Sequence, residues 1–245
     1  MLLQQCQYEE KGLSLSKQVA LILAELSSIL KKNNEEILNQ IEIKVSVGIQ
    51  ILPEIAKLNA LQLLCENLVK CYFPNHHALP SLSGQTTSRY YTSAEPELNL
   101  IRQSLQCFIF EVANIKNIEV LSFDNQEKSK RISQNIIALL EEEAKFKTIK
   151  NSFVGAEYIE KMSDAIAQQS WTLFQEIENK GGFEAFVNSG EVELWIAEDN
   201  AKEIALYKEK KKTLVGANKY ITKENEHRCR RLTVLRKFKG ADRFR

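Results

Sequence analysis

Residues 41–48, IEIKVSVG, combine β-branched side chains with an alternation of apolar and polar positions. This alternation predicts a strand with one buried face. From 53 to 72 the apolar spacing changes to the helical period, with Ile55 and Leu58 among its apolar positions. Pro53 suits the first turn of that helix, where its missing N–H costs little. A strand that leads directly into a long helix predicts a βα unit.

The same alternation of strand and helix signals continues along the chain. Further strands are predicted near 78–83 and 118–123, with a weaker signal at 146–155, and a polar loop over 84–93. Helices are predicted over 19–30, 128–145, 157–180 and 192–212. Gly181 can end the third of these, because glycine accepts a positive φ. Strands in such units should be parallel. We therefore expect an α/β protein with about four βα units, half of an eight-unit barrel, followed by C-terminal helices.

One helix is predicted to begin at Glu95–Pro96–Glu97, where acidic side chains favour the helix N-terminus. The apolar positions expected on its buried side are Leu98, Ile101, Leu105, Phe108, Ile109 and Val112. Half a barrel would leave two sheet edges with unpaired backbone groups, which is costly. Partner strands are therefore implied.

Composition excludes several classes of protein. The 245 residues are 44% apolar and 27% charged with a net charge of +1, which is typical of globular proteins and does not indicate a nucleic-acid or membrane partner. The five cysteines lack a C-x-x-C spacing, which favours a reducing cytoplasm. No apolar run approaches the roughly 20 residues that span a bilayer. The C-terminus is the local exception to the balanced charge, because His227–Arg245 carries eight Lys or Arg against one acid.

Several short motifs follow one another along the chain in the same order as in a known enzyme family. Residues 45–48 with 54–58 resemble the fifth strand and following helix of the methylmalonyl-CoA mutase barrel. The segment 83–88, SGQTTS, resembles that family's H-x-Q-T-S-G loop after the sixth strand, and 122–124 resembles the loop after the seventh. The stretch 181–220 is similar to the end of the barrel. Together the resemblance implies the second half of a (β/α)8 TIM-type barrel over 1–223, followed by a basic tail over 224–245.

The chain departs from the family at positions near the expected site. On the fifth strand Gln40 and Glu42 replace Arg and Ser, and Ser83 replaces the His of the next loop. Ser88 replaces the Gly that lets the corrin approach, and Arg89 replaces an aromatic residue. Asn125 stands where a Glu is expected, and the cobalt-binding D-x-H-x-x-G motif is absent. This pattern resembles the family's small, non-catalytic subunit, for which no catalytic and no metal-ligating residue is expected here.

The resemblance implies a heterodimer. A catalytic mutase subunit would hold adenosylcobalamin and the acyl-CoA substrate, and would interconvert methylmalonyl-CoA and succinyl-CoA. On this chain only Gln85 and Thr86 remain as candidate cofactor-binding residues, with ordinary loop hydrogen bonding as the alternative. Two other functions stay open. One is a split, divergent catalytic mutase component, and the other is a binding module that uses the basic tail to hold an acidic protein or nucleic acid.

Four further features each have a plain structural explanation. His76–His77 could bind a metal but are more simply surface histidines. Asp124 is expected to cap the next helix, and Tyr90–Tyr91 to pack against the barrel rim rather than stack on a ligand. The acidic run Glu141–Glu143 is expected on a solvated helix face.

Overall fold

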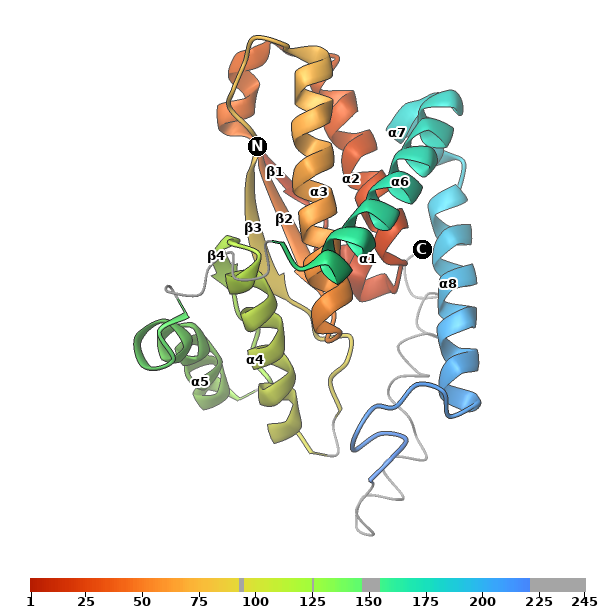
Figure 1. Ribbon diagram of the computed structural model, residues 1–245. Coiled ribbons are helices and arrows are strands. Elements are labelled where there is room, and N and C mark those ends of the chain that lie inside the picture. Colours follow the sequence, from red (N-terminus) through yellow and green to blue (C-terminus); the bar gives the residue numbers. More distant parts are fainter. Residues whose placement is uncertain (93–94, 125, 147–154, 221–245) are drawn as a thin grey trace.

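The computed structural model describes residues 1–245 except 93–94, 125, 147–154 and 221–245 (Figure 1). Its sheet has four parallel strands in the order β1-β2-β3-β4. The strands are β1 (Leu2–Gln4), β2 (Glu42–Val47), β3 (Ser81–Thr86) and β4 (Lys116–Glu119). A parallel sheet with intervening helices confirms the predicted fold class, a partial (β/α)8 barrel.

The helices follow the sequence pattern closely. They are α1 (Cys6–Lys11), α2 (Leu15–Leu30), the 3-10 helix η1 (Glu35–Gln40), α3 (Ile51–Tyr72), α4 (Glu97–Val112), α5 (Glu127–Ala138), the π-helical turn η2 (Leu139–Glu143), α6 (Glu157–Asn179), α7 (Gly182–Asn188) and α8 (Glu191–Lys208). Gly181 ends α6 with a φ of 101°, as predicted. Within the described residues, no helix combines the length and apolarity that a membrane crossing requires.

The strands differ more from expectation. β3 lies three residues later than predicted and includes part of the expected loop 84–93, and β4 lies two residues earlier. β1 has only three residues and was not predicted. The sequence SLSGQT of β3 lacks an apolar alternation, so its pairing with β2 determines its extent. The predicted strand at 146–155 falls largely outside the described residues, as does the basic tail.

The core lies on one face of the sheet. Ile43, Val45 and Val47 are buried on this face, and α2, α3 and α6 pack beside one another there (Figure 1). Val45 pairs with Gly84 of β3, and a Cβ on Gly84 would lie 2.9 Å from the ring of Phe110. Glycine at this position therefore lets α4 approach the strand closely.

Helix α4 corrects one prediction. Ile101, expected on the buried side, has 59% of its surface exposed. Several polar residues are buried instead, among them Asn99, Arg102, Gln103 and Gln106. They face the loops at the carboxyl end of the strands, which carry backbone groups that need hydrogen-bond partners. This end, at the bottom of Figure 1, is called the mouth below.

Candidate functional site

The loop that follows β3 at the mouth is held by amide side chains of α4. The backbone N–H of Thr87 donates to Gln106 Oε1 at 3.0 Å. Further along the loop, the N–H of Thr92 donates to Asn99 Oδ1 at 2.9 Å, and Asn99 Nδ2 donates back to the Thr92 carbonyl at 3.0 Å. These partners all lie on α4, so the loop is held against this helix at both Thr87 and Thr92.

A second set of contacts joins this loop to the one after β4. The fully buried Gln103 donates to the Leu121 carbonyl and the Tyr91 hydroxyl, and accepts from Ser133 Oγ at 2.9 Å. The Leu121 N–H donates to Thr86 Oγ1 at 2.9 Å. Thr86 therefore ties the end of β3 to the loop after β4, and its proposed cofactor contact stays a prediction.

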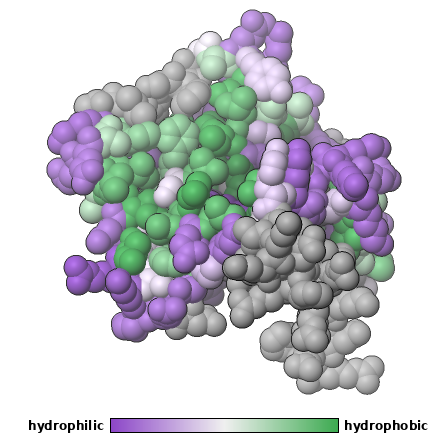
Figure 2. All heavy atoms as spheres, turned by 90° about the horizontal axis from the view of Figure 1, so that it is seen from below, coloured by the Kyte–Doolittle hydropathy of each residue, from purple (hydrophilic) through white to green (hydrophobic). Residues whose placement is uncertain are grey.

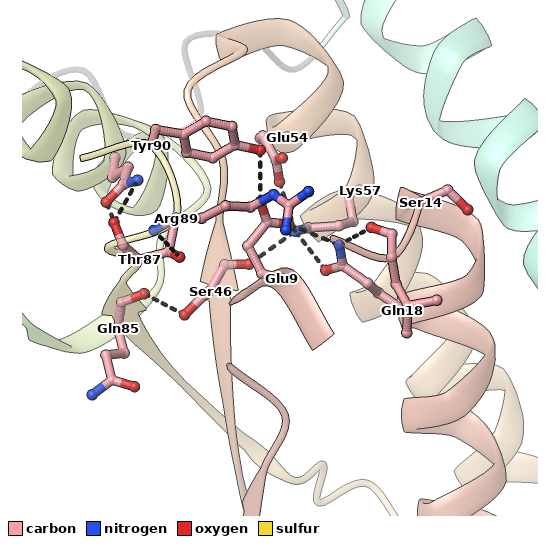
Figure 3. Close-up of polar contacts among 12 residues, drawn as sticks. Glu9, Ser14, Gln18, Ser46, Glu54, Lys57, Gln85, Thr87, Arg89 and Tyr90 are labelled. Carbon is pink, nitrogen blue, oxygen red and sulfur yellow. Dashed lines mark hydrogen bonds and ion pairs between the residues drawn. The ribbon is translucent and has the colours of Figure 1, made fainter. Parts of the chain in front are cut away.

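Gln85 lies on the sheet face opposite the core. Its carbonyl accepts from Ser46 Oγ at 2.7 Å, and its side chain points away from the neighbouring polar cluster (Figure 3). Ser83, two residues earlier and so on the same face, is buried, and its hydroxyl has no hydrogen-bond partner among the described residues. Lys44 and Glu119 form an ion pair of 3.1 Å on this face. The face is therefore polar, unlike the apolar interior typical of such barrels.

A buried charged cluster lies beside the mouth (Figure 3). Lys57 Nζ is 2.6 Å from Glu54 Oε2 and 3.9 Å from Glu9 Oε2. It also donates to Gln18 Oε1 at 3.2 Å and to the Ser46 carbonyl at 2.9 Å. All five residues are buried, so one ammonium group is shared by two carboxylates in a region of low water content.

This cluster has unusual electrostatics and contacts the mouth loop. Burial raises the pKa of Glu54 to about 7, with Lys57 opposing the shift and Glu9 adding to it. The Tyr90 hydroxyl donates to Glu9 Oε1 at 2.9 Å, and burial raises the pKa of Tyr90 well above its usual value. A Cβ on Gly48 would lie 2.8 Å from Glu54 Oε1 and 3.0 Å from the Tyr90 hydroxyl. Gly48 thus lets these groups meet.

Arg89 is the centre of a second polar contact, which we call the α8 latch and define as Arg89, Asn200 and Glu203. The buried guanidinium donates to the Glu10 carbonyl at 3.0 Å and to Asn200 Oδ1 at 3.0 Å, and forms an ion pair with Glu203. Gly12, at a φ of 82°, lies under it, and a Cβ there would collide with the guanidinium. The latch therefore fastens α8 across the mouth loop.

Two carboxylates of α8, Asp199 and Glu203, hold this helix against the rest of the chain. Asp199 accepts from the Ser14 N–H at 2.8 Å, at the N-terminus of α2, and from Lys17 Nζ at 2.9 Å. Burial disfavours ionisation of Glu203, but Arg89 and Lys212 hold the pKa of this carboxyl below its usual value. A pocket of about 280 Å³ remains between α8 and the charged cluster.

The comparisons with known proteins agree with this architecture. A sequence model described as Methylmalonyl-CoA mutase matches residues 7–241. The chain belongs to the methylmalonyl-CoA mutase family. It is 26% identical over 194 residues to the Methylmalonyl-CoA mutase small subunit of Porphyromonas gingivalis, covering 76% of this chain and 31% of that protein.

Other relatives have a similar extent. The large subunit from the same organism is 26% identical over 183 residues, covering 71% of this chain and 26% of that protein. The Methylmalonyl-CoA mutase of Escherichia coli is 24% identical over 225 residues, covering 86% of this chain and 31% of that protein. The chain thus spans about a third or less of the length of these curated relatives.

The structure separates the positions at which the chain departs from the mutase family motifs. Ser88 and Arg89 lie together at the mouth, where the Ser88 N–H donates to Glu10 Oε1 at 2.6 Å. Gln40 ends η1 and Glu42 begins β2, at the opposite end of the sheet. The two groups of departures therefore cannot act on one part of a ligand at the mouth. Asn125 lies outside the described residues.

The remaining sequence predictions have mixed outcomes. Asp124 was wrongly expected to cap α5, because α5 begins at Glu127 and Asp124 Oδ1 accepts from the Gln126 N–H at 2.7 Å within the preceding turn. His76 Nδ1 lies 3.7 Å from Glu35, and no group of three metal-ligating side chains occurs in the described part of the chain. The acidic run lies in η2.

Sequence reasoning missed the charged cluster and the α8 latch. Glu54 and Lys57 stand one helical turn apart, and this spacing could have indicated their ion pair. Glu9 carries no comparable signal, because it comes from a different helix. Contact between Arg89 and Glu203 joins residues 114 positions apart, which no local pattern predicts.

Proposed function

We propose that this chain is a non-catalytic, stabilising component of a cytoplasmic, adenosylcobalamin-dependent methylmalonyl-CoA mutase. A sister catalytic chain would hold the cofactor and the acyl-CoA, and would carry out the isomerisation. The observation that supports this most strongly is the burial of Arg89 in the α8 latch. By the resemblance, this position is aromatic in catalytic members, beside a Gly that admits the corrin.

The residues present at the mouth do not fit the cofactor. Ser88 is bound through its N–H to Glu10, and Arg89 is covered by α8. A corrin could reach the loop only after α8 had moved and the buried Arg89–Glu203 pair had separated, which is energetically costly. Ser83 also offers only a hydroxyl where the family motif has an imidazole. We therefore assign no catalytic step to this chain, and Gln85 and Thr86 stay its candidate contacts to a cofactor held by the partner.

The edges of the sheet call for further strands. Among the described strands, β1 pairs only with β2 and β4 only with β3. Exposed edges of parallel strands are normally paired or covered, and a barrel closes only when all its strands are paired. Further strands at these edges, whether from a longer form of this chain or from a catalytic subunit in a heterodimer, would complete the barrel.

Isothermal titration tests the proposal directly. The chain, titrated separately with adenosylcobalamin and with methylmalonyl-CoA, should release no binding heat. The mutase of Escherichia coli, titrated in the same buffer, provides the positive control. Tight binding of either ligand by this chain alone would refute the non-catalytic role.

A second experiment distinguishes the stabilising role from the alternative, in which the chain is a split catalytic component. The chain is mixed with a mutase large subunit, and turnover is compared for the wild type and Gln85→Ala. The stabilising role predicts equal turnover for both forms. Loss of turnover in Gln85→Ala, with the complex still formed, would favour direct participation of this chain in the reaction.

A further inference from the structure

Charge is distributed very unevenly along the chain. Residues 202–245 contain fifteen Lys or Arg and five Asp or Glu, whereas residues 1–201 contain eighteen and twenty-seven. The C-terminal part is therefore +10 and the rest −9, although the net charge of the whole is only +1. Such asymmetry indicates a segment that meets an anionic surface.

The described start of this basic segment lies at the mouth. Five of its lysines are exposed, namely Lys202, Lys208, Lys210, Lys211 and Lys219. Lys202 lies 4.0 Å from Asp199, and its side chain is 74% exposed. Lys211 pairs with Glu209 at 2.7 Å, and its side chain is 68% exposed. We call these five lysines the basic rim. Its charge faces solvent and is available to a partner.

Apolar side chains lie among these lysines. Leu206, Val215 and Tyr220 are 42%, 43% and 70% exposed. The segment also reaches α4, because Arg102 donates to the Val215 carbonyl at 2.7 Å, and α4 carries the exposed Ile101. Figure 2 views this end from below and shows apolar residues in the middle and left of the face, with hydrophilic residues on the right, where α8 lies, and also along the left and lower edges.

This combination of exposed lysines and exposed apolar side chains distinguishes between two kinds of anionic partner. Protein interfaces combine an apolar centre with a polar rim, whereas nucleic-acid sites are dominated by contacts to phosphate. Leu206 and Val215 offer nothing to a phosphate backbone, but they can pack against apolar side chains of a protein. Complementary charge then steers the encounter and fixes its orientation.

We propose that residues 202–220 form a docking surface for an acidic protein segment with apolar side chains between its carboxylates. The basic rim attracts the segment, and Leu206, Val215 and Tyr220 provide its apolar contacts. This proposal does not depend on the mutase role, because it follows from the charge and exposure of these residues.

Fluorescence anisotropy of the full chain provides the test. The probe is a fluorescein-labelled synthetic peptide in which Glu pairs alternate with Leu and Phe, compared with an all-Glu peptide of equal charge and a single-stranded DNA oligonucleotide. The chain should bind the mixed peptide at low salt, at least about tenfold more tightly than either control probe. Binding should weaken as salt rises, because exposed charges are screened.

Two charge-reversal variants locate the surface. Lys208→Glu, Lys210→Glu and Lys211→Glu together should weaken binding of the mixed peptide at least about tenfold. The matched control reverses Lys70, Lys116 and Lys161, which are exposed on other elements, and should bind as the wild type does. Circular dichroism checks that both variants are folded.

Three results would overturn the proposal. These are no binding of the mixed peptide at low salt, equal or tighter binding of the DNA or the all-Glu peptide, and equal loss in both charge-reversal variants. The second result would instead assign the surface to polyanions in general. Leu206→Ser adds a further measurement, since it should weaken the mixed peptide while leaving the all-Glu peptide unchanged.

Discussion

Removing the guanidinium of Arg89 tests how strongly α8 is held to the mouth. Arg89→Met keeps an apolar stem of similar length but removes the ion pair with Glu203 and the hydrogen bonds to Glu10 and Asn200. The side chains of the pair are only 5% and 14% exposed. Breaking such a buried pair from one side costs about 3–5 kcal/mol. Because Lys212 still contacts Glu203, we expect a loss near the lower limit, about 3 kcal/mol.

A double-mutant cycle isolates the contact itself. Glu203→Gln alone should cost about 2 kcal/mol, and the double variant should show a coupling of about 1–2 kcal/mol, as expected for residues in direct contact. Urea unfolding followed by fluorescence gives the free energies, and Trp195 on α8 provides a local reporter. Hydrogen exchange should show faster exchange in α8 of Arg89→Met. A coupling below about 0.5 kcal/mol, with α8 protection unchanged, would refute the latch.

Three other substitutions give distinct outcomes. Burial raises the pKa of Glu54 from 4.5 to about 7, so the folded protein holds this proton more tightly than the unfolded chain does. The free energy of unfolding should therefore fall by about 3 kcal/mol as the pH rises from 4.5 to 7. Glu54→Gln should remove this fall, as measured by urea titrations across that pH range. Gly84→Ala, whose Cβ would lie 2.9 Å from Phe110, should cost about 1–3 kcal/mol in thermal unfolding, and Phe110→Leu should restore part of it. Asp199→Ala removes the bond from the Ser14 N–H and the ion pair with Lys17, and should destabilise α8 by about 1–2 kcal/mol, measured by hydrogen exchange.

The sequence predicted those elements whose burial follows a regular period. β2 and α3 are examples, because one face of each is consistently apolar. β3 was displaced because Ser83, Gly84 and Gln85 carry no such alternation, so their extended form depends on pairing with β2. Local propensity contains no information about this neighbour.

Helix α4 shows a different limit. Its apolar period suggested that Ile101 would be buried, yet the helix turns Asn99, Gln103 and Gln106 inward. Unpaired backbone groups in the mouth loops cost more than exposing one isoleucine, because buried N–H and carbonyl groups require partners. The local motif named Gln85 and Thr86 as candidate cofactor contacts, and that role stays a prediction. The α8 latch carried no local signal, because it depends on tertiary contacts.

Helix α8 uses its two sides for different purposes. Asp199 and Glu203 point inward, to the N-terminus of α2 and to Arg89, while Lys202 and Lys208 are exposed to solvent. A partner that binds the basic rim therefore meets positive charge without separating the buried ion pair below it. Docking and closure of the mouth are compatible in this arrangement. A split catalytic component would need the opposite behaviour, since its partner would have to release Arg89 and open the mouth. The distribution of charge on α8 is thus compatible with the proposed stabilising role.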